Sequence, residues 1–561
     1  MTGVQTCALP IFGTQYYKCS EDNFNAPKPY EFPNKKARFL TSIAFQTKKE
    51  ISGPILSNDA NNTNIKFGKS ALSILKKNTN KGYHLLPMTF GRNIAEFSTT
   101  KLVNPISALA LSLGHIFKFN YKDGLLFVVP AFWTKQQRIF LESTCELFEI
   151  PYLGTITDVQ ALAQIYSNLK YQRYAKKNES DNHPYKVMFI DIGSTSTKIY
   201  GLEFKWTGTK SDVKQILTLW NERIGGYHFQ KKVAITNKVS MKKALKILRK
   251  GETKDIELEM TEFKSLLNNA KEQMKDVNEI QLIGGSMSYS FIVNAIKESF
   301  DNLTVIRKEF DPTNTISQGG AYFGLQVKDA LPYPQCNFTK QNLYDLTLTF
   351  SHEHNLCKNG TCEAEIKENG KGVQMITIKG NINDLPRGSS NIYDKYLLTN
   401  ITNLTFSEND NSYGIINLNE NQDITSIQWC KEENECNVIS FRNTLRYDFM
   451  NQINPASYDL YISLRNKETK QEKIGLLYSL LEEVDVFIRE FNLESDPKLK
   501  EFQDFYHSIK DLPYTELTNE IMDKANTIIK DTYEIIQKSP LFKDIKDNYN
   551  QIGRASCRER V

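Results

Sequence analysis

The pattern of hydrophobic and polar positions changes twice along the chain. Between residues 12 and 330, short apolar runs alternate with segments of helical period, which is typical of an α/β domain. From 331 to 440 the period is two, as in "DLTLTFS" (345–351), which predicts a half-buried antiparallel sheet. From 441 to 551, apolar residues recur every three or four positions, which predicts a helical bundle.

Individual elements can be predicted within this order. In the α/β part we expect strands at 124–132 and 279–285, helices at 136–148 and 290–300, and a hairpin formed by 185–193 and 197–204. In the last part, one apolar face is interpreted as bundle core, with contact to a client protein as the alternative. This face carries Ile474, Leu477, Leu481, Val484, Ile488 and Phe491, and a second one carries Ile521, Ala525, Ile528 and Ile535.

The composition is that of a globular protein with two or three domains. The 561 residues carry 70 lysines and arginines against 65 acidic residues, a formal net charge of +5. This near balance argues against a nucleic-acid partner. No apolar run approaches the roughly 18 residues that a membrane-spanning helix needs, so membrane insertion is not expected.

Both ends of the chain resemble translated sequencing-adapter read-through. Residues 1–11, "MTGVQTCALPI", and 552–561, which contain "GRASCRERV", are therefore left out of the expected fold. The true termini, and with them any signal peptide or retention signal, are expected to be missing.

Two pairs of cysteines lie close enough in sequence to close small loops. Cys357 and Cys362 form the first pair, and Cys430 and Cys436 form the second. Disulfides in an oxidising compartment and a zinc site are both open interpretations, although no spacing nearby matches a zinc finger well. The Asn-x-Ser/Thr sequons are about as frequent as chance predicts, so they permit a secretory location without arguing for one.

The stretch "FIDIGSTSTKIYG" (189–201) carries the clearest candidate chemistry. An apolar run ends at Asp191. The residues that follow are small or hydroxylated, and include Gly193, Ser194, Thr195 and Ser196. Such a turn lets backbone N–H groups approach phosphate oxygens, and a neighbouring carboxylate can hold Mg²⁺ through water. Alone, the motif is weak evidence for a phosphate-binding loop, because many strands end in small residues.

Three further segments strengthen this interpretation. They are Gly225 and Gly226 in "IGGYHF", Gly284, Gly285 and Ser286 at the end of a predicted strand, and Asp158 before a predicted helix. We expect the two glycine turns to contact the ligand, with ordinary strand-ending turns as the alternative. Asp158 is expected in the metal shell, with a helix cap as the alternative.

In order and approximate spacing, these segments resemble the actin-like ATPase domain of the seventy-kilodalton heat-shock chaperones. "VVPAFWTKQQR" is similar to the family's strand–helix step ahead of its catalytic acid, and "DVQALAQIYS" to the helix after that acid. "DIGSTSTKI" resembles the second phosphate loop, and "LIGGSMSYSFI" the adenosine motif. The helical end most resembles the large divergent branch, above all the hypoxia up-regulated type of the endoplasmic reticulum.

The resemblance implies a two-lobed α/β actin-like ATPase domain over 12–330, truncated at its N-terminus and with one sublobe shortened. An antiparallel β domain (331–440) and an α-helical bundle (441–551) would follow it. The implied ligands are ATP or ADP with Mg²⁺, with Asp158 and Asp191 as catalytic and metal-binding acids. Lys246 and Ser288 would lie near the adenosine.

The implied function is that of a chaperone in the endoplasmic reticulum lumen, with the cytoplasm as the alternative. Such a protein would hold unfolded polypeptides and act as the nucleotide-exchange partner of a conventional lumenal heat-shock chaperone.

The sequence departs from the family pattern where catalysis is concerned. The first phosphate loop has no match, and the chain is expected to enter the fold at about residue 38. Pro87 or Met88 stands where the family has a catalytic lysine, and Ser288 stands where it has an arginine. Because phosphoryl transfer depends on positioning and charge neutralisation, we expect at most a weak ATPase. An ATP-hydrolysing foldase and a degenerate interaction protein that binds no nucleotide are the alternatives.

Overall fold

The computed structural model describes most of residues 7–538. Its larger gaps are 22–26, 31–35, 48–53, 56–61, 93–99, 175–183, 301–304, 328–334, 340–347, 351–355, 358–361, 369–372, 381–385, 400–412, 419–423, 431–435, 445–454, 491–496 and 513–517, and the remaining breaks are one or two residues long. The chain forms two compact units, Met1–Tyr461 and Ile462–Val561.

The first unit contains a sheet with the strand order β3-β2-β1-β8-β9. β1 is antiparallel to β2 and parallel to β8, and β8 is parallel to β9. The bounds are β1 (Cys7–Phe12), β2 (Tyr16–Glu21), β3 (Lys28–Pro29), β4 (Phe39–Leu40, paired with β2), β8 (Leu125–Val129) and β9 (Tyr152–Thr157). The expectation that residues 7–11 lie outside the fold is therefore wrong, because they form most of the strand between β2 and β8.

A second sheet repeats this pairing pattern. Its order is β14-β13-β10-β11-β12-β15, and β10 is antiparallel to β11 and parallel to β13. The bounds are β10 (Tyr185–Ile192), β11 (Thr197–Thr207), β12 (Lys210–Asn221), β13 (Glu279–Ile283), β14 (Val305–Arg307) and β15 (Gln335–Thr339). The predicted hairpin and the predicted strands at 124–132 and 279–285 are thereby confirmed. The β1–β2 and β10–β11 turns hold equivalent places in the two sheets.

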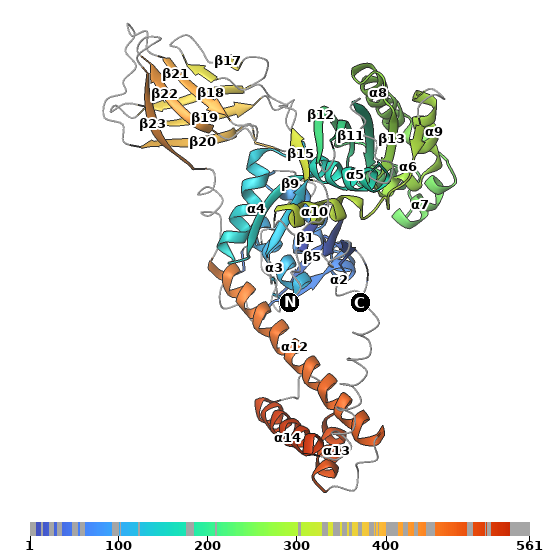
Figure 1. The fold of residues 1–561 in the computed structure, drawn as a ribbon, viewed down its shortest axis with the longest axis vertical. Helices are drawn as coiled ribbons and strands as arrows, with labels where there is room; N and C mark the ends of the chain where they lie inside the picture. Colours follow the sequence, from blue (N-terminus) through green and yellow to red (C-terminus); the bar gives the residue numbers. More distant parts are fainter. Residues whose placement is uncertain are drawn as a thin grey trace. The chain divides into compact units, whose positions relative to one another are not determined.

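Both faces of the second sheet are covered by helices or by other strands. Successive residues along a strand point to opposite faces, so neighbouring residues of β10 contact different cores. Met188 and Ile190 of β10 share a core with α6, α7, α8 and α9. Val187 and Phe189 point the other way and share a core with α5, α10 and residues of β8 and β9. Figure 1 shows α8 and α9 beside β13, and α5 and α10 nearer the first sheet. The bounds are α5 (Asp158–Tyr174), α6 (Gly226–Thr236), α7 (Met241–Arg249), α8 (Glu257–Gln273), α9 (Ser290–Ser299) and α10 (Thr315–Val327).

Smaller elements complete the α/β part. A small sheet of order β6-β5-β7 lies beside α2. The helices predicted at 136–148 and 290–300 are confirmed as α4 and α9. The bounds are β5 (Ile43–Gln46), β6 (Asn64–Phe67), β7 (Gly82–Tyr83), α2 (Gly68–Leu75), α3 (Pro105–Phe117), α4 (Lys135–Leu147), and the short 3₁₀ helices η1 (Thr79–Lys81), η2 (Leu86–Thr89), η4 (Lys254–Ile256) and η5 (Gly285–Ser288).

An antiparallel sheet of eight strands follows, in the order β17-β16-β21-β22-β23-β20-β19-β18. The period-two pattern therefore predicted its type correctly. The bounds are β16 (Leu348–Phe350), β17 (Leu356–Cys357), β18 (Cys362–Glu368), β19 (Val373–Gly380), β20 (Ile392–Thr399), β21 (Tyr413–Leu418), β22 (Ile424–Cys430) and β23 (Cys436–Asn443). Contacts such as Lys135 Nζ to Asp394 Oδ2 at 2.7 Å join this sheet to α4 within the first unit. The first compact unit therefore includes this sheet and ends at Tyr461.

The cysteines of this sheet partly answer the question of disulfides. Cys436 is disulfide-bonded, and the register of β22 and β23 places Cys430 opposite it. This favours the disulfide interpretation over zinc for that pair. The side chains of Cys357 and Cys362 lie outside the described residues.

The second unit is helical, as its period predicts. It contains most of α12 (Pro455–Glu490), together with α13 (Pro497–Ile509) and α14 (Asn519–Lys538). Leu481, Val484 and Ile488 are buried with residues of α13 and α14, among them Ala525. For these positions the interpretation as bundle core is confirmed. Ile474, Leu477 and Phe491 have side chains outside the described residues.

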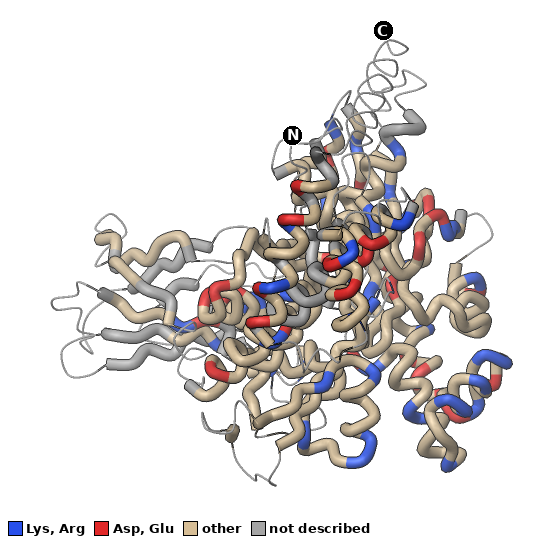
Figure 2. Tube along the Cα trace, turned by 90° about the horizontal axis from the view of Figure 1, so that it is seen from below, with Lys and Arg blue, Asp and Glu red and all other residues tan. Residues whose placement is uncertain are grey.

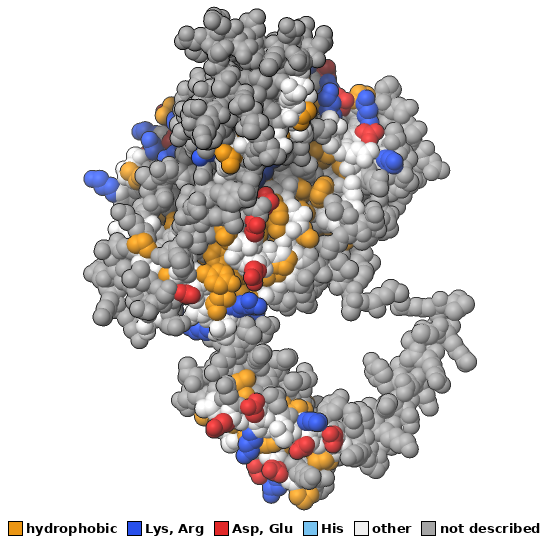
Figure 3. Space-filling view, turned by 90° about the vertical axis from the view of Figure 1, so that its left-hand side faces the viewer, with side chains coloured by type: hydrophobic (Ala, Val, Ile, Leu, Met, Phe, Trp, Pro, Cys, Tyr) orange, Lys and Arg blue, Asp and Glu red, His pale blue; other side chains and the backbone are white. Residues whose placement is uncertain are grey.

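Charge is distributed without a dominant sign. Figure 2 shows blue and red positions interspersed along the described chain, and Figure 3 shows both signs mixed with hydrophobic side chains on one face. This mixture agrees with the near-balanced net charge. Among the described helices, none is both long and apolar enough to cross a membrane.

Candidate functional site

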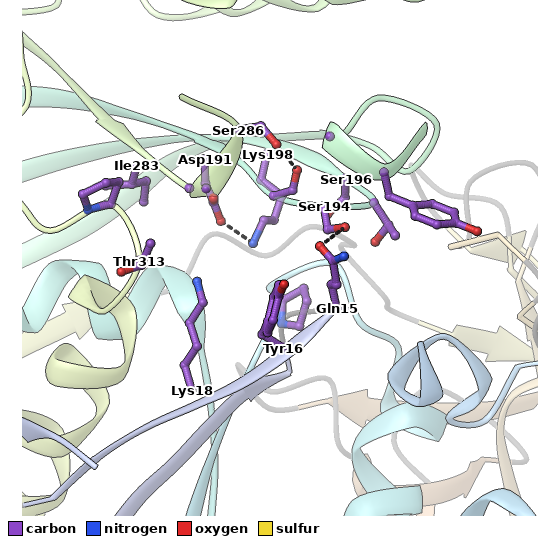
Figure 4. Close-up of a pocket in the computed structure, with 18 of the residues that line it drawn as sticks. Gln15, Tyr16, Lys18, Asp191, Ser194, Ser196, Lys198, Ile283, Ser286 and Thr313 are labelled. Atoms are coloured by element: carbon purple, nitrogen blue, oxygen red, sulfur yellow. Dashed lines mark hydrogen bonds and ion pairs between the residues drawn. The ribbon is translucent and has the colours of Figure 1, made fainter. Parts of the chain in front are cut away.

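A cleft of about 330 Å³ in the first unit is lined by the hairpin turns of both sheets. Figure 4 shows Ser194 and Ser196 of the second hairpin facing Gln15 and Tyr16 of the first. The Ser194 hydroxyl donates to Gln15 Oε1 at 3.2 Å, so the two turns are in direct contact. Of the predicted ligand-binding residues, the cleft is lined by Asp191, Gly193, Ser194, Thr195, Ser196, Gly226, Gly284, Gly285, Ser286 and Ser288.

The three small-residue bends meet at this cleft. The Gly226 N–H donates to the Gly193 carbonyl at 3.0 Å, and the Tyr227 N–H donates to the Ser194 carbonyl at 2.7 Å. The Ser286 hydroxyl donates to the same Gly193 carbonyl at 2.8 Å. Segments up to 93 residues apart thus hold one loop in place.

Two glycines are required by this close packing. A Cβ on Gly225 would lie 2.5 Å from the Ser194 carbonyl oxygen, so the residue supports the loop although it does not line the cleft. Gly284 has φ +92°, and a Cβ there would lie 2.4 Å from both Asp191 Oδ1 and the Ile192 carbonyl oxygen. An L side chain would be strained at Gly284 by both its backbone angle and its neighbours.

Lys198 joins the two predicted acids, and the sequence interpretation overlooked it. Its ammonium lies 2.5 Å from Asp191 Oδ2 and 2.8 Å from Asp158 Oδ2. The three side chains are at most 7% exposed. Burial acts to lower the pKa of Lys198, but the charges of the two acids outweigh it and hold that pKa above its ordinary value.

A signal for this lysine was present in the strand pattern. Lys198 lies directly opposite Asp191 in the antiparallel register of β10 and β11. Opposite charges at facing positions of two strands attract each other. A tight loop between Asp191 and Lys198 therefore favours an ion pair between them.

Asp158 is not a helix cap. Its Oδ1 accepts from the Ala131 N–H at 2.9 Å and from the Tyr200 hydroxyl at 2.7 Å, and its Oδ2 faces the lysine ammonium. The start of α5 is capped instead by Thr157 and Gln160. The Thr157 N–H donates to Gln160 Oε1, and the Gln160 N–H donates to Thr157 Oγ1. The helix cap, which was the alternative role considered for Asp158, is thus provided by Thr157.

This donor set does not fit Mg²⁺. The ion requires about six oxygen ligands at about 2.0–2.1 Å and usually keeps several waters. The space between Asp158 and Asp191 is filled by the Lys198 ammonium, and Asp158 does not reach the cleft. No group of three or more His, Cys, Asp or Glu suited to a metal is found among the described residues. The expectation that both acids hold the metal through water therefore disagrees with the side chains.

The first hairpin supplies a second lysine that the sequence interpretation missed. Lys18 of β2 lines the cleft, and Figure 4 shows its ammonium directed toward Asp191. Burial lowers the pKa of Lys18 to about 8, a shift that the charge of Asp191 opposes. No described residue makes a hydrogen bond or an ion pair with this ammonium. Lys18 was missed because the fold was predicted to begin near residue 38. A signal was present, since an apolar run followed by Gly13 and Thr14 resembles the start of the second hairpin.

Apolar groups stand where the family resemblance would place a lysine. Pro87 and Met88 of η2 both line the cleft. The Thr195 hydroxyl lies 3.7 Å from the Met88 sulfur, so Met88 packs against the loop. Nearby, Arg92 pairs with Glu222 at 2.5 Å. The Arg92 charge is therefore already balanced within the protein.

The predicted adenosine contacts are only partly at the cleft. Ser288 lines it, whereas Lys246 is exposed on α7 and does not. Arg249, one helical turn further along α7, lines the cleft instead. The basic residue expected from α7 is thus Arg249, because the helix presents positions 245 and 249 to the cleft.

No protein-family model and no curated protein matches this chain.

Proposed function

We propose that this chain is an ATP-binding molecular chaperone of the large heat-shock type. In this proposal it holds unfolded polypeptides in the endoplasmic reticulum lumen. It also acts there as the nucleotide-exchange partner of a conventional lumenal heat-shock chaperone. The cleft built by the two hairpin turns and the glycine bends is the single observation that carries the nucleotide-binding part.

The chemistry of the cleft favours an anionic ligand. Small residues at 193–196 and 284–286 allow backbone N–H groups to approach phosphate oxygens. Lys18 and Arg249 add positive charge to the lining, and Lys198 offsets the charge of Asp191. A polyphosphate ester such as ATP or ADP matches this combination of a tight loop and several cations.

Other residues at and behind the cleft favour binding of ATP without efficient hydrolysis. Asp158 is fully buried by its partners, and Pro87 and Met88 offer no charge to a transferring phosphoryl group. Efficient phosphoryl transfer needs cationic groups and a positioned nucleophile at the reacting phosphate. We therefore propose at most weak ATPase activity, which disfavours the foldase alternative.

The roles in holding clients and exchanging nucleotide rest on the family resemblance of the later segments. An antiparallel sheet and a helical unit follow the α/β part in the expected order. Cys436 is disulfide-bonded, which agrees with an oxidising compartment.

Removing the Lys18 charge is expected to weaken ATP binding and to change its pH dependence. Lys18→Met should lower the affinity about tenfold at pH 7, because one cation is lost beside the phosphates. In the unaltered protein the affinity should fall as the pH rises from 7 to 9 through about 8, where Lys18 loses its proton. Calorimetry between pH 6 and 9 measures both effects.

The control is Lys28→Met, since Lys28 is exposed on the neighbouring β3 and does not line the cleft. It should keep both the affinity and the pH profile. An unaltered protein that binds ATP with the same affinity at pH 7 and pH 9 would contradict the role given to Lys18.

The chaperone activity is tested by light scattering of a denatured client. The full chain, at an equimolar ratio, is expected to suppress aggregation and to accelerate ADP release from a conventional lumenal chaperone. Single-turnover measurements should show little conversion of bound ATP. Absence of both suppression and exchange would reject the chaperone proposal and favour an interaction protein of another kind.

A further inference from the structure

Lys198 occupies the position between Asp158 and Asp191 where the sequence interpretation places a metal ion. Its ammonium bridges Asp158 Oδ2 at 2.8 Å and Asp191 Oδ2 at 2.5 Å. Asp191 and Lys198 both line the cleft, whereas Asp158 lies behind them. The bridge therefore presents one face to the cleft and is anchored on the other.

The bridge is held by further contacts. Tyr200 and the Ala131 N–H both donate to Asp158 Oδ1, which fixes the carboxylate toward the lysine. The facing register of Asp191 and Lys198 in the hairpin fixes the other acid. Breaking such a buried arrangement leaves charges unpaired, so the ammonium is a permanent part of the site.

Electrostatics then oppose a divalent ion at the same place. Two carboxylates offer two negative charges, and the ammonium already balances one of them. A divalent cation would need both acids and would have to lie beside another cation. Lys18, on the opposite side of the cleft, balances the second negative charge, so the two lysines together remove the charge that would repel an anionic phosphate (Figure 4).

We propose that Lys198 replaces the divalent cation, so that the cleft takes its phosphate-bearing ligand without a metal ion. This inference rests on the proposed function, since it concerns the same cleft and takes ATP as the ligand. The proposal predicts that the site accepts free ATP and does not require the complex of ATP with Mg²⁺.

The first test needs no variant. ATP affinity of the full chain is measured by calorimetry in excess Mg²⁺ and again in excess EDTA, at constant ionic strength and pH 7. The two dissociation constants are expected to agree within about threefold, because the protein's own ammonium groups supply the positive charge. A loss of tenfold or more in EDTA would overturn the inference while leaving the proposed nucleotide binding intact.

The second test asks whether removing the lysine creates a metal requirement. Lys198→Ala frees two neighbouring carboxylates, which repel phosphate and suit Mg²⁺. Its ATP affinity in EDTA should fall at least tenfold and should recover in excess Mg²⁺. The double variant Lys198→Ala with Asp158→Asn keeps only one carboxylate and should not show this recovery.

A matched control is Lys170→Ala. Lys170 is also a buried lysine paired with a carboxylate, Glu279 at 3.1 Å, but it does not line the cleft. This variant should lose stability without gaining any dependence of ATP binding on Mg²⁺. A magnesium requirement in Lys170→Ala would show that the effect is not specific to the bridge.

A third measurement separates this inference from the proposed function. Without nucleotide, Mg²⁺ is expected to raise the melting temperature of Lys198→Ala but not that of the unaltered protein. If the unaltered protein binds no ATP in either buffer, the nucleotide-binding function is rejected. The melting experiment then decides the metal question alone: equal responses to Mg²⁺ in both proteins would overturn the role of Lys198.

Discussion

Replacing Gly284 by alanine is expected to lower the free energy of unfolding of the α/β part by about 2–5 kcal/mol and to abolish ATP binding. The backbone at Gly284 has φ +92° and ψ 148°, a region essentially reserved for glycine. A Cβ would also lie 2.4 Å from Asp191 Oδ1 and from the Ile192 carbonyl oxygen. Relief of these contacts must displace Asp191 and with it the bridge to Lys198.

The neighbouring glycine provides a matched control for this substitution. Gly285 has no atom within 4 Å of the position that a Cβ would take. Gly285→Ala should therefore change stability by less than about 0.5 kcal/mol. Thermal unfolding followed by tryptophan fluorescence compares the two variants. A melting temperature of Gly284→Ala within about 2 °C of that of Gly285→Ala would refute the packing described here.

Replacing Glu279 by glutamine is expected to lower the free energy of unfolding by about 3–5 kcal/mol. This is the largest effect that we expect outside the cleft. Glu279 is fully buried at the start of β13. Its carboxylate lies 3.1 Å from the Lys170 ammonium and 3.3 Å from Arg307 Nε. The Tyr166 and Tyr185 hydroxyls also donate to it, at 3.3 and 3.1 Å. An amide cannot balance the lysine charge, which would remain buried and uncompensated.

An exposed ion pair is the control for the Glu279 variant. Lys264 and Glu298 are 3.0 Å apart, with half or more of each side chain exposed. Glu298→Gln should change the free energy of unfolding by no more than about 0.5 kcal/mol, because water screens the pair. Denaturant titration measures both variants. Equal midpoints for Glu279→Gln and Glu298→Gln would show that the buried cluster contributes little net stability.

The local periodicity of the chain was sufficient to predict many of its elements. A helix or strand of ordinary length repeats its apolar positions several times, so the signal is internal to the segment. The helices at 136–148 and 290–300, the hairpin around 189–201 and the antiparallel type of the sheet after 340 were predicted on this basis. Small residues after Asp191 likewise pointed to a tight loop, because small and hydroxylated residues favour turns.

The partners of the charged side chains depended on tertiary structure. Asp158 and Asp191 were predicted as a pair, but a metal was placed between them, whereas the facing strand inserts Lys198. Residues 1–11 were set aside as adapter-like, and the fold was expected to begin near residue 38. The strand β1 nevertheless pairs with both β8 and β2, and this pairing brings Lys18 of β2 into the cleft. Arg249 rather than Lys246 lines the cleft, since the helix orientation selects one turn of a uniformly basic segment.

The sequence by itself determined the order of the structural classes, the positions of several helices and strands, and the small residues that form the bends. Only the tertiary structure decided which charges meet in the cleft. Strand register and burial set the distances between residues far apart in the sequence, and local periodicity carries no information on those distances.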